Sequence, residues 1–237
     1  AWMCGKDGFD SPLTGKRMSL VLRGMRSSFR VKRKPKLPFT RSHIRSFMKF
    51  ARRSGSFVHW RAAVVLTACF QDFLRFAEVA HMRLEDISLD ERGLVMKVRQ
   101  AKNHRVGFES RLPVERGRLN SIGAFVLEFL EKFLLWEPGM AGALCAKVNG
   151  GRSDSRTGVS YSVLRNSCKD LMKCVGLDPR LYGTQSSKRG AATGAARAGC
   201  SSAEIVAMGR WHCPDTGLLY VHDGPDFRRD LSARFST

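Results

Sequence analysis

The segment His59–Leu74 constrains the fold of this chain most, because it is a long and strongly apolar helical pattern. A surface helix shows one apolar stripe, whereas a helix that is apolar over most of its circumference is buried. The sequence therefore predicts a buried helix here, and a hydrophobic content of 43% is enough to build a core around it. The core side chains expected from this segment are Val64, Val65, Leu66, Cys69, Phe70 and Phe73.

Shorter patterns flank this helix on both sides. Thr40 is placed to cap a helix over Arg41–Arg52, and another short helix is expected over about Phe76–Met82. The segments Leu94–Arg99 and Val106–Val114 both alternate in polarity, which is the period of a half-buried strand. Together they predict a β-hairpin.

The C-terminal half predicts mainly helices. A polar loop is expected over Asn149–Thr157, and Gly199 is a typical C-terminal stop for the helix before it. The expected helices are Asn120–Trp136, Gly158–Val175, Gln185–Ala198, Ser201–Met208 and a last one that starts at Pro214 and carries Leu218, Leu219 and Tyr220. The predicted fold class is therefore α+β, mostly α with a small β-hairpin or sheet.

The charge of the chain favours a polyanionic partner. Lys and Arg number 41 against 21 acidic residues, which gives a formal net charge of +20. Such an excess points first to nucleic acid and second to an anionic membrane surface. The membrane is the weaker alternative, because no apolar run approaches the roughly 18 residues needed to span a bilayer and no signal-peptide pattern opens the chain. The opening residues Ala1–Trp2 are more typical of a fragment than of a natural start.

The cysteines favour neither a metal site nor a disulfide framework. There are seven, an odd and scattered set without a CxxC motif. Most lie in apolar helical contexts, where a thiol behaves as a small buried hydrophobe. We therefore expect an intracellular, reducing compartment.

Two cations in the middle of the chain are candidates for phosphate chemistry. Arg75 lies within an apolar helical pattern, Phe73–Ala80, and a buried guanidinium needs a partner. It either forms a structural ion pair with Glu78 or provides a two-point fork for phosphate oxygens. Lys102 lies in the predicted hairpin turn, where it is either solvated or able to reach a minor groove and protonate a leaving oxygen.

A second group of candidates lies near the C-terminus. Gln185 opens a helix whose first turns carry Lys188 and Arg189, and free amides at a helix N-terminus attract anions. Tyr220 and Trp211 are either half-buried packing aromatics or parts of a site. For Tyr220 the second alternative is a nucleophile, which requires a cationic pocket around its hydroxyl.

The order and spacing of these residues resemble the catalytic domain of tyrosine recombinases, the phage-integrase family that includes Cre-type enzymes and the recombinases of DIRS-like retroelements. In that family an Arg precedes a Glu in a helix, as in Leu74–Ala80, and a hairpin Lys follows 27 residues later, as Lys102 does here. A His-x-x-Arg motif opens a later helix, and its flanks match Gly183-Thr184 and Arg189–Thr193. A Gly-x-Trp element precedes the nucleophilic Tyr by nine residues, as Trp211 precedes Tyr220.

The resemblance implies a metal-free and cofactor-free strand transfer. Tyr220 would attack a scissile DNA phosphate to form a 3′-phosphotyrosine, and Lys102 would protonate the leaving 5′ oxygen. Arg75 and Lys188 would hold the non-bridging oxygens, whose charge grows in the transition state. The remaining implied roles are phosphate orientation by Gln185, an indole N–H from Trp211, and support from Glu78 and Arg189.

Two positions depart from the family pattern, because Gln185 replaces the His and Lys188 replaces the Arg. An amide does not titrate, so Gln185 cannot be a general base. Lys188 keeps a cation but loses the planar two-point fork. The alternatives are a working recombinase, an inactive descendant kept for DNA binding or assembly, and a basic domain that binds RNA or another polyanion.

The resemblance also predicts organisation and partners. Residues 1–36 are interpreted as the end of an N-terminal DNA-clamping domain plus a basic linker, 37–222 as the catalytic domain, and 223–237 as a tail that docks on a neighbouring subunit. The expected partner is double-stranded DNA, bound by a homotetramer that is a monomer or dimer when free. The protein is expected in the nucleus of a eukaryote and otherwise in the cytoplasm. The predicted DNA-contacting residues are Lys34, Lys36, Arg105, Tyr161, Arg165 and Lys169.

Overall fold

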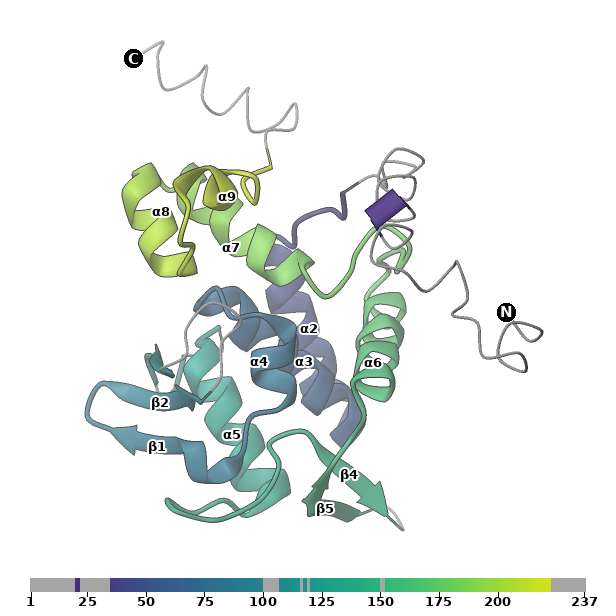
Figure 1. Ribbon diagram of the computed structural model, residues 1–237. Coiled ribbons are helices and arrows are strands. Elements are labelled where there is room, and N and C mark those ends of the chain that lie inside the picture. The colour runs from purple at the N-terminus through teal and green to yellow at the C-terminus, as the bar shows by residue number, and fades with distance from the viewer. Residues whose placement is uncertain are drawn as a thin grey trace, which may run out of the picture. The chain divides into compact units, whose positions relative to one another are not determined.

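Figure 1 shows the computed structural model of the chain, which describes residues 20–21, 35–99, 107–115, 117–118, 120–149 and 152–222. Backbone contacts divide the chain into two compact units, Ala1–Pro35 and Lys36–Thr237. The helices and strands named below all belong to the second unit. The three-part domain division expected from the sequence stays a prediction.

Helix α3 (Phe57–Gln71) is the buried helix expected from the apolar segment. Its residues from Trp60 to Phe70 are all buried, and it packs against α2, α5, α6 and α7. Trp60 stacks on Phe125 of α5 with ring centres 4.5 Å apart. The helix ends three residues earlier than expected, at Gln71, with consequences for Arg75 described below.

Helix α2 (Arg41–Ser54) begins where the sequence predicts. The Thr40 side chain accepts a hydrogen bond from the His43 backbone N–H, and the His43 side chain accepts one from the Thr40 N–H. This reciprocal cap satisfies two of the free amides at the helix start. Gly55 closes the helix with φ +62°, a conformation that favours glycine.

The predicted hairpin is confirmed and forms part of a larger sheet. Strands β2 (Gly93–Val98) and β3 (Phe108–Leu112) pair antiparallel. A further strand, β1 (Ile87–Asp90), pairs antiparallel with β2 and was not expected from the sequence. It follows the short helix α4 (Phe76–Ala80) and a single 3-10 turn, η1 (Leu84–Asp86).

The expectation of a polar loop over Asn149–Thr157 is wrong. Strands β4 (Ala146–Asn149) and β5 (Arg152–Gly158) form a second antiparallel pair. Strand β5 lacks apolar alternation, so the sequence carries no strand period there. Its backbone pairs with β4, and the Ser153 hydroxyl donates to the Phe133 carbonyl at 2.6 Å.

The remaining helices begin and end close to their expected bounds. They are α5 (Ile122–Leu134), α6 (Tyr161–Cys174), α7 (Ser186–Arg197), α8 (Ser202–Gly209) and α9 (Pro214–Leu218). Ser201 and Glu204 form a capping box at α8, and Pro214 occupies the first turn of α9, as expected. Helix α9 is shorter than expected: it ends at Leu218, so Leu219 and Tyr220 lie beyond it.

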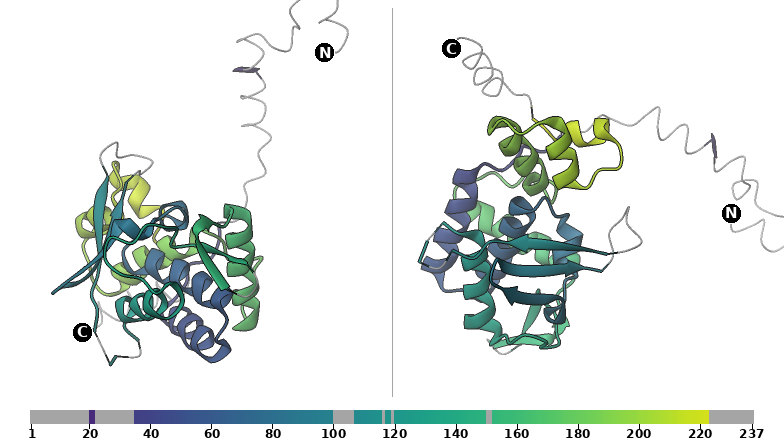
Figure 2. Two further views of the ribbon diagram at one scale, coloured as in Figure 1. Left: turned by 90° about the horizontal axis from the view of Figure 1, so that it is seen from below. Right: turned by 90° about the vertical axis from the view of Figure 1, so that its left-hand side faces the viewer.

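The described part of the second unit has a main core and a smaller one. The main core surrounds α3, whereas the smaller one joins Phe73, Ala191, Ala192, Ile205 and Trp211. Tyr220 packs against this smaller cluster. Helices α7, α8 and α9 lie together at one end of the unit (Figure 1 and the right view of Figure 2), and Tyr220 lies just beyond α9.

The fold class is confirmed as mostly helical with small antiparallel sheets. Within the described residues, no helix has both the length and the apolar character needed to cross a membrane.

Candidate active site

Arg75 lies between two helices rather than inside one, so the expectation of a helix over Phe73–Ala80 is wrong. Phe73 adopts φ +52°, a left-handed conformation that separates α3 from α4. Arg75 then takes extended dihedrals, φ −78° and ψ 146°, at the N-cap of α4. The break explains why the guanidinium is partly accessible, with 24% of the side chain exposed.

Glu78 holds Arg75 through both its backbone and its side chain. The Arg75 backbone N–H donates to Glu78 Oε2 at 2.7 Å, and Nη1 donates to Oε1 at 2.8 Å. The Glu78 side chain is only 4% exposed, so its two oxygens are committed to this one residue. The ion pair expected from the sequence is therefore present, and it fixes the direction of the guanidinium.

Arg75 and Glu78 also border a hollow on the surface. It measures about 440 Å³ and extends to Lys97 and Arg99, at and just beyond the end of β2. Arg99 pairs there with the buried carboxylate of Asp86 at 2.6 Å. Arg75 therefore borders an open hollow whose rim carries both cations and the carboxylates that pair with them.

Lys188 is buried beside Arg75, on the first turn of α7. Only 3% of the residue is exposed. Its Nζ donates to the Gly209 carbonyl at 2.7 Å and lies 4.6 Å from the centre of the Trp211 ring. Burial, together with the nearby guanidinium groups of Arg75 and Arg210, lowers the pKa of Lys188 to about 7.

Trp211 connects Lys188 to Tyr220. The indole is 7% exposed, and its ring centre lies 4.9 Å from that of Tyr220 with the planes tilted by 44°. Gly209 permits this packing, because a Cβ there would stand 1.7 Å from an indole carbon. Tyr220 is half-buried, and its hydroxyl makes no hydrogen bond to any described residue.

Arg210 joins this group although the sequence did not single it out. It adopts φ +53°, and its Nη2 donates to the Asp72 carbonyl oxygen at 2.8 Å. The same guanidinium lies 3.4 Å from the Asp72 carboxylate and 4.0 Å from the centre of the Phe108 ring. Arg210 therefore ties the segment before Trp211 to the end of α3 and to β3.

The sequence indicated the contact between Arg210 and Asp72 only in part. Arg210 precedes Trp211 directly, which places it near any site built on the indole. Its partner Asp72 is 138 residues away, however, and nothing local connects the two. Burial raises the pKa of the Asp72 carboxyl and lowers that of the Arg210 guanidinium.

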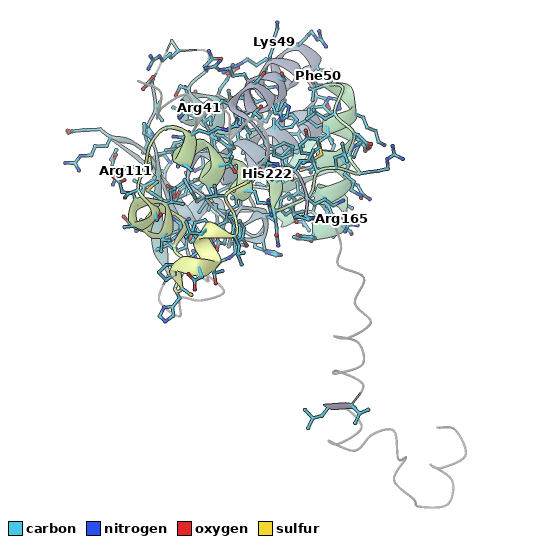
Figure 3. The ribbon with its side chains drawn as sticks, turned by 90° about the horizontal axis from the view of Figure 1, so that it is seen from above. Arg41, Lys49, Phe50, Arg111, Arg165 and His222 are labelled. Atoms are coloured by element: carbon cyan, nitrogen blue, oxygen red, sulfur yellow. The ribbon has the colours of Figure 1, made fainter. Side chains whose placement is uncertain are left out.

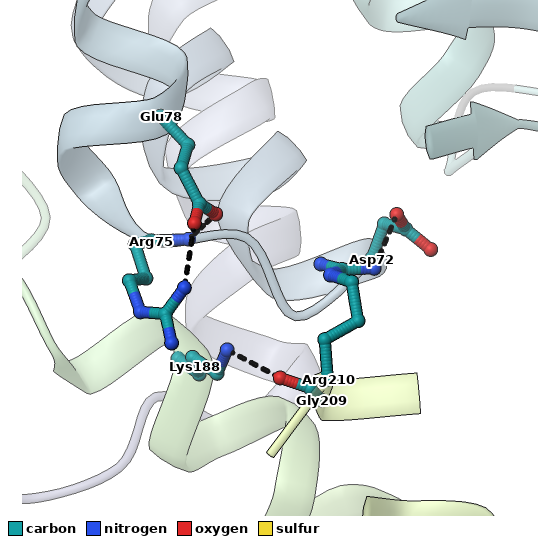
Figure 4. A network of polar contacts seen from close by, with 6 residues as sticks. All are labelled: Asp72, Arg75, Glu78, Lys188, Gly209 and Arg210. Carbon is teal, nitrogen blue, oxygen red and sulfur yellow. Dashed lines mark hydrogen bonds and ion pairs between the residues drawn. The ribbon is translucent and has the colours of Figure 1, made fainter. Parts of the chain in front are cut away.

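Figure 4 shows the resulting polar network. Cations from three separate segments converge, and two carboxylates accompany them. The three cations are Arg75, Lys188 and Arg210, and the two carboxylates are Asp72 and Glu78. An anion such as a phosphodiester would add the negative charge that this corner lacks.

Gln185 and Arg189 lie at the margin of the group. Gln185 is the N-cap residue of α7, and its exposed side chain makes no capping hydrogen bond. Arg189, the residue after Lys188, is half-buried, and its buried Nε has no hydrogen-bond partner among the described residues. Gln185 therefore holds the position that the family pattern gives to a His, but with a side chain that does not titrate.

The predicted DNA-contacting residues fall into two groups. On α6, Tyr161 is 40% exposed and packs its ring edge-on against Phe76, Arg165 is exposed and Lys169 is half-buried. Figure 3 labels Arg165 on this helix. Lys36 donates to the Arg180 carbonyl. Lys34, Lys102 and Arg105 lie outside the described residues.

Metal ligands do not cluster in this region. Among the residues that the structure describes, no group of three or more His, Cys, Asp or Glu side chains could hold a metal ion. Described cysteines such as Cys69 and Cys168 are free thiols, and burial raises their pKa far above its usual value.

Solved structures share this architecture. The XerA recombinase superposes with a TM-score of 0.62 at 15% identity, covering 100% of this chain and 80% of its own. The XerH site-specific recombinase bound to palindromic difH substrate, in a post-cleavage complex, gives 0.60 at 11% identity over 86% and 54%. The Tn1549 transposon integrase with a circular intermediate DNA gives 0.56 at 15% identity over 99% and 74%. No family model matches the sequence, and no curated protein does.

The chain has the fold of a tyrosine-recombinase catalytic domain. It spans 54% of the XerH chain, so the likeness concerns this domain and not the whole of that protein. Within the tyrosine-recombinase fold of this chain, the short helices α7–α9 bring Lys188, Arg210, Trp211 and Tyr220 to the ends of α3 and α4.

Proposed function

We propose that this chain cleaves and rejoins DNA strands in site-specific recombination, through a 3′-phosphotyrosine formed by Tyr220. One observation carries the proposal: Tyr220 packs on Trp211, the indole lies beneath the Lys188 ammonium, and the same corner contains Arg75 and Arg210. The phenol of Tyr220 and these cations come from segments that are far apart in the sequence.

In this mechanism the cations hold the non-bridging oxygens of the scissile phosphate. Charge on these oxygens grows as the Tyr220 oxygen attacks, so preorganised cations stabilise the transition state more than the ground state. Arg75 is preorganised by Glu78, because the buried carboxylate leaves the guanidinium little freedom. Gln185, exposed at the start of α7, can donate an amide hydrogen bond to a phosphate oxygen but cannot move a proton.

The remaining proposed roles rest on the resemblance. Trp211 would offer its indole N–H, Lys102 would protonate the leaving 5′ oxygen, and Arg189 would support the phosphate site. Rejoining reverses the cleavage step, because the phosphotyrosyl bond retains the energy of the broken one. No metal or nucleotide takes part in these steps.

The proposed substrate is duplex DNA. The net charge of +20 supports a polyanion, and exposed or half-exposed Tyr161, Arg165 and Lys169 make α6 the proposed base- and backbone-contacting helix. Lys34, Lys36 and Arg105 are further proposed contacts. XerH is described in complex with its difH substrate and the Tn1549 integrase with transposon DNA, which supports DNA as the partner here.

Assembly and context are also proposals. The chain would act as a homotetramer on DNA, with residues 223–237 docking on the neighbouring subunit. An origin in a transposable element, such as a DIRS-like element, fits the likeness to a transposon integrase. The protein would act in the nucleus of a eukaryote and in the cytoplasm otherwise.

A suicide-substrate assay tests the proposed reaction. A nicked duplex that releases a short oligonucleotide after cleavage traps the covalent protein–DNA adduct. We expect adducts with the unaltered chain and none with Tyr220→Phe. The matched control is Tyr182→Phe, since Tyr182 stacks on Phe39 in the main core and should leave adduct formation intact.

A second candidate function is an inactive, DNA-binding descendant of a recombinase. The exposed, non-titrating Gln185 at the expected position of a His favours it. Duplex binding without any adduct, at high protein concentration and over a wide pH range, would support this alternative and exclude the enzyme.

A further inference from the structure

The proposed cleavage step leaves one proton without an acceptor. Attack by Tyr220 requires its phenol to lose a proton as the bond to phosphorus forms. Gln185, which stands where the family pattern has a titratable His, cannot take that proton. A group at the indole of Trp211, against which Tyr220 packs, is a candidate acceptor. The following inference rests on the proposed function.

Lys188 is the buried amine at that place. Its Nζ has one hydrogen-bond acceptor, the Gly209 carbonyl, and no ion pair with any carboxylate in the described part of the chain. The two nearby carboxylates are engaged elsewhere, Glu78 with Arg75 and Asp72 with Arg210. A buried ammonium without a carboxylate partner is costly, and losing its proton relieves that cost.

On balance, the charged groups that face Lys188 also favour its neutral amine form. Arg75 from α4 and Arg210 from the end of α8 oppose the ammonium, and Glu78 only partly offsets them. On α3, Cys69 is a neutral thiol because burial raises its pKa, and Asp72 is bound to Arg210. With its pKa lowered to about 7, Lys188 exists as both amine and ammonium near neutral pH.

Trp211 places this amine and the phenol against one ring. Lys188 Nζ lies 4.6 Å from the indole centre, and the Tyr220 ring centre lies 4.9 Å from it. The amine and the phenol therefore border the same side chain, in the corner where the scissile phosphate would be held.

We propose that Lys188, in its neutral form, accepts the phenol proton of Tyr220 during strand cleavage and, as the resulting ammonium, stabilises the charge on the non-bridging phosphate oxygens. The bond formed joins Tyr220 Oη to phosphorus, and the bond broken joins phosphorus to the 5′ oxygen. The phenol proton moves to Lys188 Nζ, while the 5′ oxygen takes a separate proton from the Lys102 ammonium of the proposed mechanism. Rejoining returns both protons.

Bound DNA would make the neutral amine of Lys188 a stronger base and would move the rising limb of the pH–rate profile to higher pH. A phosphodiester brings a negative charge next to Arg75 and Arg210 and so offsets the repulsion that disfavours the ammonium. The proton affinity of Lys188 then rises as the phosphate enters and rises again as charge develops in the transition state. One side chain thus acts as base before the transition state and as oxyanion partner within it.

Lys188→Arg tests the proposal sharply, because it restores the cation of the family pattern but removes the titratable amine. Single-turnover cleavage of the suicide substrate is measured from pH 5.5 to 9. For the unaltered chain we expect the rate to rise with pH and level off. For Lys188→Arg we expect a loss on the order of 100-fold or more above neutral pH, with that rising limb absent. Lys173→Arg on exposed α6 is the matched control.

Chemical rescue keeps the test valid if arginine does not fit the buried position. Lys188→Ala leaves space for a small primary amine, and added ethylamine should restore cleavage in proportion to its unprotonated form. A substrate with a bridging sulfur at the 5′ position separates the two proton transfers, because a thiolate leaves without protonation. We expect the Lys188→Arg defect to persist on that substrate.

Three results would overturn the proposal. They are cleavage by Lys188→Arg at or above the unaltered rate with the same pH profile, no amine rescue of Lys188→Ala, and recovery of Lys188→Arg on the sulfur-bridged substrate. Absence of any adduct from the unaltered chain would instead reject the proposed function itself, so the two failures are distinguishable.

Discussion

Arg75 and Glu78 are joined at two points across the start of α4. One carboxylate oxygen accepts from the Arg75 guanidinium at 2.8 Å and the other from the Arg75 backbone at 2.7 Å. The buried carboxylate of Glu78 therefore caps the start of α4 and also fixes the direction of the Arg75 guanidinium. The proposed phosphate binding by Arg75 and the stability of the helix start therefore depend on the same side chain.

Glu78→Gln should lower both stability and cleavage. The amide keeps one acceptor oxygen but loses the charge, leaving Arg75 without its ion-pair partner. We expect the free energy of unfolding to fall by about 2 kcal/mol and single-turnover cleavage to slow, with duplex affinity nearly unchanged. Urea unfolding and the adduct assay measure the two effects.

The control for this change is Glu109→Gln on β3. Glu109 pairs with Lys97 at 3.8 Å, and both side chains are about 60% exposed. Exposed pairs contribute little, so this variant should lose less than about 0.5 kcal/mol. Equal losses from the two variants would show that Glu78 has no special role.

Substitutions of Arg210 can separate the effect of its backbone conformation on stability from the effect of its side-chain bonds. Arg210→Ala and Arg210→Gly both remove the bonds to Asp72, but only glycine suits the left-handed φ of +53°. We expect the glycine variant to be more stable than the alanine variant by roughly 0.5–1 kcal/mol. Both should melt below the unaltered chain. An alanine variant as stable as the glycine variant would mean that the backbone relaxes there.

Local chemistry in the sequence was enough to predict several elements. Thr40 before a basic amphipathic segment predicted the start of α2, and alternating polarity predicted the β2–β3 hairpin. Trp211 and Tyr220, whose nine-residue spacing contributed to the family resemblance, pack together in the structure. Periodicity and capping are local properties, so a single sequence reveals them.

Long-range packing decided the features that were missed. Phe73 takes a left-handed φ and packs its ring edge-on against the distant Trp211, and this break removes Arg75 from the expected helix. Strand β5 has no apolar alternation and depends on pairing with β4. The lowered pKa of Lys188 arises from neighbours on other segments, which a linear pattern does not reveal.

The buried amine of Lys188 also predicts a pH dependence of stability. Its pKa falls from 10.5 in the unfolded chain to about 7 in the folded one. Between these values the unfolded chain holds a proton that the folded chain has released, so the free energy of unfolding rises with pH. Relative to Lys188→Met, the unaltered chain should therefore gain stability from pH 7 to pH 9 in urea unfolding. A flat difference would mean that Lys188 stays charged in the fold.

Salt dependence of duplex binding tests the proposed role of α6. Each lost phosphate contact should reduce the slope of log affinity against log salt by about 1. We expect this reduction for Arg165→Ala and for Lys169→Ala. Lys173→Ala is the matched control, because Lys173 already pairs with Asp170 at 3.1 Å. Unchanged slopes for the first two would exclude α6, and tighter binding of RNA than of duplex DNA would favour the polyanion-binding alternative.

Peptide mapping of a trapped protein–DNA adduct tests the central claim most directly. The chain has three tyrosines, Tyr161, Tyr182 and Tyr220, so the linkage can be assigned without ambiguity. We predict that digestion with protease and nuclease yields one modified peptide, with the nucleotide phosphate on Tyr220. A linkage to either of the other tyrosines, or duplex binding with no covalent peptide at all, would contradict the account.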